Sequence, residues 1–212
     1  MANTHIFSKG EEIANAIIHG IGAISSIAAL AVLVVYSSYE GNAWHIVTFT
    51  IFGATMLILY TCSTLVHSFP EGKAKDIFEI LDHSSIYLFI AGSYTPFLLL
   101  AIKGTVGWTL FGIVWGLTLA GIIFKSFFTK RFVLASTLLY VAMGWLIVFA
   151  WKPLVAGMST PGLVLLVIGG LLYSVGAVFY VWRGFRFHHA IWHLFVVGGS
   201  AAHFFSVMTL LP

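Results

Sequence analysis

The sequence predicts an all-α integral membrane protein: a bundle of seven transmembrane helices in a single domain that takes up residues 1–212. Hydrophobic residues make up 60% of the chain and charged residues 8%, which is too apolar for a soluble protein of this size. Stretches of about 18 to 25 mostly apolar residues recur, each long enough to cross a hydrocarbon layer of about 30 Å as a helix. The connections between them are short, so no room is left for a second domain.

The seven predicted spans are separated by polar or charged breaks. The first follows a charged segment without a small-residue cleavage pattern, so we expect a retained helix and not a removable signal peptide. Polar residues 37–42 end it, and the Pro-Glu-Gly-Lys segment at 70–73 ends the second. Lys or Arg residues interrupt each later boundary. In chain order the spans are residues 13–36, 43–68, 77–101, 106–124, 132–151, 162–181 and 187–211.

The positive charges fall mostly on one side of this topology. Only Lys103 and Lys152 lie on the opposite side. The residues on the richer side are Lys9, Lys73, Lys75, Lys125, Lys130, Arg131, Arg183 and Arg186. Because basic residues concentrate in cytoplasmic loops, we expect a cytoplasmic N-terminus and an external C-terminus in a multi-pass cell membrane protein. Basic loops beside an anionic leaflet explain the positive net charge, and no nucleic-acid partner is needed.

Four ionisable residues stand at the edges of these apolar spans: His67, Asp82, His189 and His193. Ionisable groups at membrane depth are costly, so each is a candidate functional residue. The end of the second span and the starts of the third and seventh lie on the same side of a seven-helix bundle. We therefore expect all four side chains at one level, near the cytoplasmic face.

The spacing of the histidines predicts a metal site. His189 and His193 are four residues apart and share a helix face, the geometry by which two imidazoles hold one metal. With His67 they make three neutral nitrogen ligands, which suit a zinc ion with a fourth position open to water. Asp82 is the expected general base or water-orienting group. Ser63, one turn before His67, is expected to hydrogen-bond Asp82, the water or a substrate carbonyl.

Other interpretations of the same residues remain. A membrane histidine is often an interhelical hydrogen-bonding group, and an isolated H-x-x-x-H pair is weak evidence for a metal. A structural zinc with Asp82 as its fourth ligand would tie the helices together and close the site to substrate. His203 lies about 21 Å along the helix from His189 and is predicted to be a packed polar group.

Four motifs resemble those of a known family. They are N-A-I-I-H-G-I-G at 15–22, S-T-L-V-H-S-F at 63–69, L-D-H-S at 81–84 leading to G-S-Y-T-P at 92–96, and H-A-I-W-H at 189–193 leading to His203. In this order the chain resembles the bacterial hemolysin III proteins. These are relatives of the progestin and adipoQ receptors, which include the adiponectin receptors. Val66 stands where the bacterial members frequently have tyrosine.

The resemblance implies a seven-helix bundle in the bacterial cell membrane, with a zinc ion held by His67, His189 and His193. It places Asp82 and Ser63 beside the metal-bound water. The receptor branch is associated with hydrolysis of ceramide-like lipid amides, and the bacterial branch is named for cytolytic activity.

Three functions follow as hypotheses. The leading one is a zinc-dependent hydrolase that acts on a membrane lipid amide or ester entering from the bilayer. The second is a non-enzymatic lipid sensor or regulator with structural zinc. The third is a cytolytic pore, although a pore needs a continuous polar stripe and the fourth to sixth spans carry almost no polar residues. Membrane lipids are the expected partners in each case.

Overall fold

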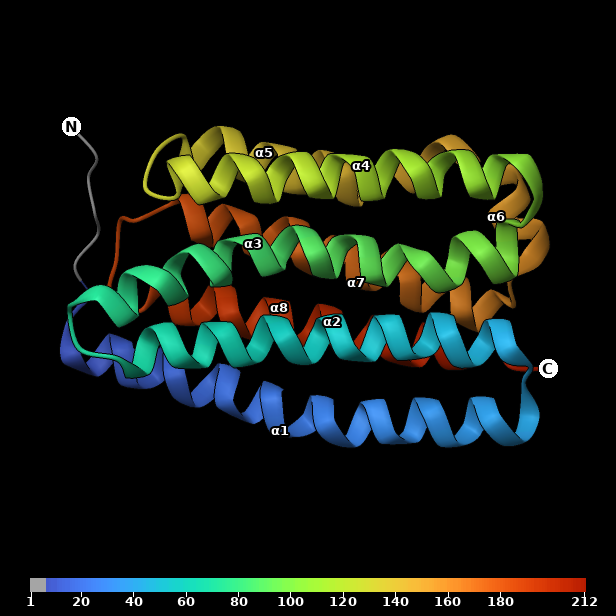
Figure 1. Cartoon of the computed structure of the whole chain (residues 1–212), viewed down its shortest axis with the longest axis horizontal. Helices are drawn as coiled ribbons and strands as arrows, with labels where there is room; N and C mark the ends of the chain where they lie inside the picture. The colour runs from blue at the N-terminus through green and yellow to red at the C-terminus, as the bar shows by residue number, and fades with distance from the viewer. Residues whose placement is uncertain (1–6) are drawn as a thin grey trace.

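The computed structural model describes residues 7–212, and these form antiparallel helices lying side by side (Figure 1). Within residues 7–212, seven helical segments are long and apolar enough to cross a membrane, which confirms the predicted fold class. The elements are α1 (Lys9–Glu40), α2 (Ala43–Ser68), α3 (Lys73–Pro96), η1 (Phe97–Ile102), α4 (Gly104–Phe128), α5 (Val133–Gly144), η2 (Leu146–Ala150), α6 (Trp151–Gly157), α7 (Thr160–Val181) and α8 (His188–Met208).

The bundle is apolar outside and partly polar inside, as expected of a protein whose solvent is lipid. Large side chains such as Ile24, Phe127 and Phe149 are exposed on its flanks. Ser26 and Thr118 are buried between helices, and their hydroxyls donate to the backbone carbonyls of Gly22 and Tyr87. Internal satisfaction of polar groups is what a hydrocarbon environment requires.

Helix α1 is longer at both ends than the predicted span of residues 13–36. It begins at Lys9 because Ser8 and Glu11 form a capping box, in which each side chain bonds the other residue's backbone N–H. The hydrophobic run alone could not show this extra turn, since its residues are polar. That turn carries Glu11 and Glu12 to the end of the bundle where α2 finishes and α8 begins.

The fifth span is interrupted, which corrects the prediction of one unbroken helix over residues 132–151. α5 ends at Gly144, and a 3-10 segment and the short α6 complete the crossing. Tyr94 satisfies the freed backbone groups: its hydroxyl accepts from Ile147 N and lies 2.8 and 2.7 Å from the carbonyl oxygens of Met143 and Gly144. Non-helical backbone is tolerated at membrane depth when the protein itself provides such partners.

The third span bends into a π-helical turn after Pro96. Proline has no backbone N–H, so the regular hydrogen-bond ladder cannot continue through it. The backbone N–H of Lys103 instead donates to the carbonyl of Leu98, five residues earlier. The predicted third span, residues 77–101, is therefore confirmed as a candidate membrane span, which runs over Lys73–Ile102. Its last turn is π-helical and not α-helical.

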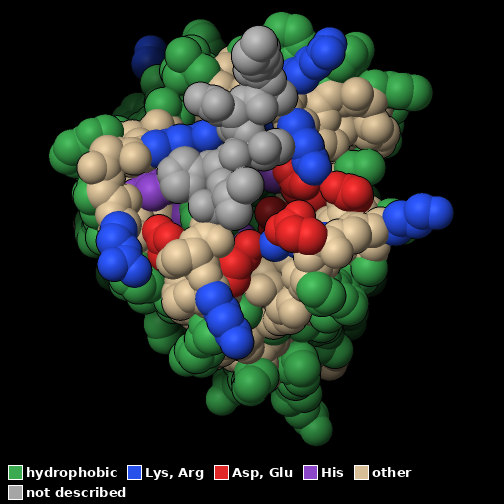
Figure 2. Space-filling model, turned by 90° about the vertical axis from the view of Figure 1, so that its left-hand side faces the viewer, with side chains coloured by type: hydrophobic (Ala, Val, Ile, Leu, Met, Phe, Trp, Pro, Cys, Tyr) green, Lys and Arg blue, Asp and Glu red, His purple; other side chains and the backbone are tan. Residues whose placement is uncertain are grey.

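One end of the bundle is strongly charged, and we call it the histidine end because α2 finishes there with His67 and α8 begins there with His188 and His189. Figure 2 shows Lys, Arg, Asp and Glu side chains gathered on this end, with hydrophobic side chains on the flanks. The arrangement agrees with the charge asymmetry of the sequence. A cytoplasmic placement of this end remains a prediction from that asymmetry.

Candidate metal centre

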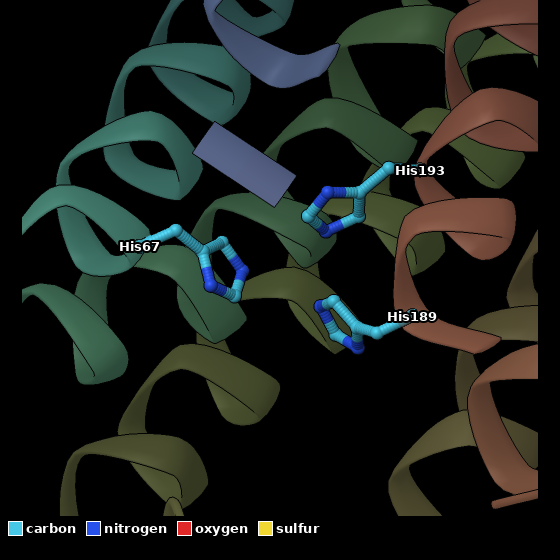
Figure 3. A group of neighbouring side chains, drawn as sticks. All are labelled: His67, His189 and His193. Atoms are coloured by element: carbon cyan, nitrogen blue, oxygen red, sulfur yellow. The ribbon is translucent and has the colours of Figure 1, made fainter. Parts of the chain in front are cut away.

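Three histidines from two helices converge at the histidine end. His67 lies in the last turn of α2, and His189 and His193 lie on one face of the first two turns of α8. One nitrogen from each ring lies within 4.8 Å of the others, and Figure 3 shows the rings facing a common space. The structure therefore brings together the three residues predicted from spacing, in a group that could hold a metal ion.

Packing holds these rings in a largely dry environment. His193 is 2% exposed, and the ring of His19 from α1 stacks on it with centroids 3.5 Å apart and an angle of 15°. Phe7 lies against His189 with ring centroids 4.9 Å apart. His19 supports His193 by this stacking contact, and neither of its own ring nitrogens has a hydrogen-bond partner among residues 7–212.

Glu12 of α1 is a functional candidate that the sequence interpretation missed. Its Oε2 lies 2.6 Å from Nδ1 of His67, and its Oε1 accepts a hydrogen bond of 2.6 Å from Nζ of Lys75. Metal-binding histidines commonly donate their second nitrogen to a carboxylate in this way. The topology places the start of the first helix at the same end as His67, but it does not indicate which side chain there meets the imidazole.

Glu11 fixes the start of the helix that carries the other two histidines. Its Oε1 accepts a hydrogen bond of 2.9 Å from the backbone N–H of Phe187, the residue before α8. Phe187 has a φ of 61°, a left-handed conformation that is uncommon for a bulky residue. The bond from Glu11 helps to hold this turn, and thereby the register from which His189 and His193 project.

Asp82 and Ser63 lie beside the group of three and not within it. Both line one cavity together with His189 and His193. Asp82 is half-buried on α3, and its carboxylate makes no hydrogen bond to any residue from 7 to 212. Ser63 is 1% exposed, and its hydroxyl has no partner among those residues. The arrangement leaves the histidine group open on the side that these two side chains face.

Two cavities meet at this site. The first, of about 130 Å³, extends into the bundle between apolar side chains as far as Trp145 and His203. The second, of about 330 Å³, lies at the histidine end among charged residues that include Glu71, Lys75 and Lys130. The walls that both cavities share are Asp82, His83, Tyr180 and His189.

Two further histidines that line the first cavity are engaged elsewhere. His203 donates from Nε2 to the carbonyl of Leu166, 3.2 Å away, at the far side of the first cavity. His83 places its Nδ1 2.8 Å from the Glu79 carbonyl and its Nε2 3.2 Å from the Tyr180 hydroxyl. Neither belongs to the group of three, which for His203 agrees with its predicted role as a packed polar group.

The fold and this site define a class: a seven-helix membrane protein with three converging histidines at one end of its bundle. The model of the "Haemolysin-III related" family matches residues 7–204. The chain belongs to this family, and the resemblance deduced from the four motifs is confirmed.

Relatives from bacteria and animals match almost the whole chain. A protein of Bacillus subtilis (strain 168) named "Hemolysin-3 homolog" is 59% identical over 203 residues, which cover 96% of this chain and 95% of the relative. "Hemolysin-3" of Bacillus cereus is 57% identical, covering 93% of this chain and 90% of its own. The human "Monocyte to macrophage differentiation factor" is 30% identical, covering 95% and 84%. The wider relation to the animal branch is therefore also supported.

Proposed function

We propose that this protein is a zinc-dependent hydrolase that cleaves an amide or ester bond of a membrane lipid, as a ceramidase does. The observation that carries the proposal is the junction of the two cavities. There the three imidazoles are open toward Asp82 and Ser63, with an apolar space on one side and a polar space on the other. Lipid and water can reach the same point from opposite sides.

The donor set fits zinc. Three neutral imidazoles without a carboxylate in the group are a common ligand set of catalytic zinc sites, in which one position stays open. A structural site would need a fourth protein ligand, and Asp82 lies outside the group. Zinc held there would supply Lewis acidity that polarises a carbonyl and lowers the pKa of water toward neutrality.

Asp82 is the proposed general base. Its carboxylate faces both cavities and is not engaged by another residue within 7–212, so it is free to take a proton from water arriving from the polar side. The same proton can then pass to the nitrogen or oxygen that leaves as the amide or ester bond breaks. The buried hydroxyl of Ser63 is available to orient that water or to donate to the substrate carbonyl.

The apolar cavity supports a substrate from the bilayer. Its far wall includes Trp145, at the end of α5, and Ser174 on α7. The indole Nε1 of Trp145 donates a hydrogen bond to the Ser174 hydroxyl. Trp145 is itself partly exposed on the lipid-facing side of the bundle. An acyl chain entering between α5 and α7 would lie in this cavity with its carbonyl toward the histidines. The positive-inside asymmetry would place that reaction at the inner leaflet.

The test is hydrolysis of a panel of lipid amides and esters by purified, metal-loaded protein in detergent or nanodiscs. Asp82→Asn should keep its metal and lose at least about 100-fold in turnover, the usual contribution of a positioned acid–base group. Asp76→Asn is the matched control, because Asp76 lies on the same helix but pairs with Lys130 at the surface. Turnover by Asp82→Asn equal to wild type would reject the assigned base. Metal binding without turnover of any lipid would favour the sensor hypothesis.

Lysis is the second candidate, because two of the bacterial relatives carry the name hemolysin. Dye release from liposomes separates it from hydrolysis. Leakage that persists in Asp82→Asn would support a lytic activity independent of the proposed chemistry. Vesicles that stay intact while their lipid is hydrolysed would reject the lytic function.

A further inference from the structure

We propose that Glu12 is the positioning carboxylate of the metal centre, which fixes the tautomer and the ring orientation of His67. This inference rests on metal binding by the three histidines, and it does not require that the protein be a hydrolase. It concerns a residue on α1, a helix that supplies none of the three ligands.

The contact between Glu12 and His67 dictates which nitrogen can bind a metal. An ionised carboxylate only accepts hydrogen bonds, so Nδ1 of a neutral His67, 2.6 Å from Oε2, must carry the hydrogen. Nε2 then keeps its lone pair and is the nitrogen left to face His189 and His193. A histidine with the opposite tautomer would turn an N–H toward the metal position and could not bind there.

The second oxygen of Glu12 is held as firmly as the first. Nζ of Lys75 donates to Oε1 at 2.6 Å and reaches Glu71 at 2.9 Å. The side chains of Lys75 and Glu12 are only 17% and 18% exposed, so water competes weakly for this pair. With both oxygens engaged, the carboxylate is held against His67, and Glu12 is not a member of the group that could hold the metal.

The other ligands are oriented by packing and not by a carboxylate. His193 is stacked on His19, and its Nδ1 has no hydrogen-bond partner among residues 7–212. His189 is enclosed by Phe7, Tyr180 and the neighbouring histidine rings. His67 stands on a different helix from the other two, so its alignment with them depends most on a specific bond.

A purely structural role would be the alternative, in which Glu12 fastens α1 to α2 and α3. Such a role lowers the stability of the metal-free and metal-loaded protein alike. A positioning role weakens metal binding itself and changes the ligand field. Removal of partners of this kind typically costs 10–100-fold in metal affinity.

The experiment measures binding of Zn²⁺ by chelator competition and of Co²⁺ by its visible d–d spectrum, on the full chain in detergent. Glu12→Ala should bind Zn²⁺ about 10–100-fold more weakly than wild type, with an altered Co²⁺ spectrum. Glu12→Gln keeps an oxygen that can accept from Nδ1, so it should lose less and recover part of the spectrum. Asp76→Asn, an acid-to-amide change at the same end, should match wild type in both.

A double-mutant comparison isolates the route through His67. In a His67→Ala background, Glu12→Ala should cause no further loss of the residual affinity, since the group it orients is gone. Wild-type affinity and an unchanged Co²⁺ spectrum in Glu12→Ala would overturn the proposal while leaving the metal site intact. Absence of metal binding by the wild type would overturn both the metal site and the positioning role of Glu12. Glu12-dependent binding without lipid turnover would keep the positioning role and remove the hydrolase.

Discussion

Helix α2 carries a histidine near each of its ends, and the two could hardly be told apart by residue type or burial. His45 and His67 are both 9% exposed. Both ring nitrogens of His45 contact backbone groups: Nδ1 accepts a hydrogen bond from Asn42 N at 3.2 Å, and Nε2 lies 3.2 Å from the Leu210 carbonyl oxygen. His67 gives one nitrogen to Glu12 and turns the other toward two imidazoles.

The difference lies in the partners. A histidine whose nitrogens are both hydrogen-bonded to backbone groups needs no further ligand. The role of His45 is therefore to cap α2 and to hold the C-terminal end of the chain. When one ring nitrogen instead faces other imidazole nitrogens, its hydrogen-bonding or metal-binding capacity is left for a ligand bound between them. The histidine end therefore carries a group that could hold a metal ion, whereas the opposite end is a structural junction.

The largest expected effect separates the two ends by their response to metal. Zn²⁺ at about 100 times its Kd should stabilise the wild type by about 2.7 kcal/mol, because it binds only the folded state. His189→Ala should lose most of this gain, whereas His45→Ala should keep it. Thermal unfolding in detergent with and without Zn²⁺ measures the difference. Equal stabilisation of His189→Ala would place the metal elsewhere.

The opposite end should respond in stability alone. His45→Ala removes the bonds to Asn42 and Leu210 and should lower the free energy of unfolding by about 1–2 kcal/mol. Chemical unfolding of the metal-free protein tests this expectation. A loss of metal affinity in the same variant would contradict the division between the two ends.

Ser63 should show the reverse behaviour. Its hydroxyl is buried without a partner among residues 7–212, so Ser63→Ala should leave stability unchanged or slightly higher. If the hydroxyl orients water or substrate, turnover should fall about tenfold, which corresponds to about 1.4 kcal/mol of transition-state stabilisation. Ser26→Ala is the control, since that buried serine already donates to Gly22. Unchanged turnover in Ser63→Ala would remove its proposed role.

The smallest effect is expected at the surface of the histidine end. Lys130 pairs with Asp76 and Glu79, but its side chain is 43% exposed, so Lys130→Met should change stability by only about 0–1 kcal/mol. Hydrogen bonding to Asp76 raises the pKa of Lys130, so this contribution should persist through neutral pH and be lost as the pH rises through that raised pKa. A larger loss, or one insensitive to salt, would show that the pair is more than a surface contact.

The sequence alone was sufficient for the helix count and for the convergence of His67, His189 and His193. Apolar run length and the direction of each span set the depth of these residues, and the four-residue spacing set their shared face. These are local or topological properties, and they survive errors of a few residues at helix ends.

The contacts made by α1 and the break in the fifth span were beyond such reasoning. Glu12 reaches His67 only because the capping box extends α1 by a polar turn, and Tyr94 supports the break after Gly144 from a different helix. Both depend on side chains that meet across the bundle, for which neither hydrophobic periodicity nor spacing along one helix carries a signal.

The most direct test of the metal centre is elemental analysis of the purified protein beside His67→Ala and His45→Ala. We predict close to one zinc per chain in the wild type and in His45→Ala, and little in His67→Ala. A wild type without metal, or a His67→Ala variant with as much zinc as the wild type, would contradict the account.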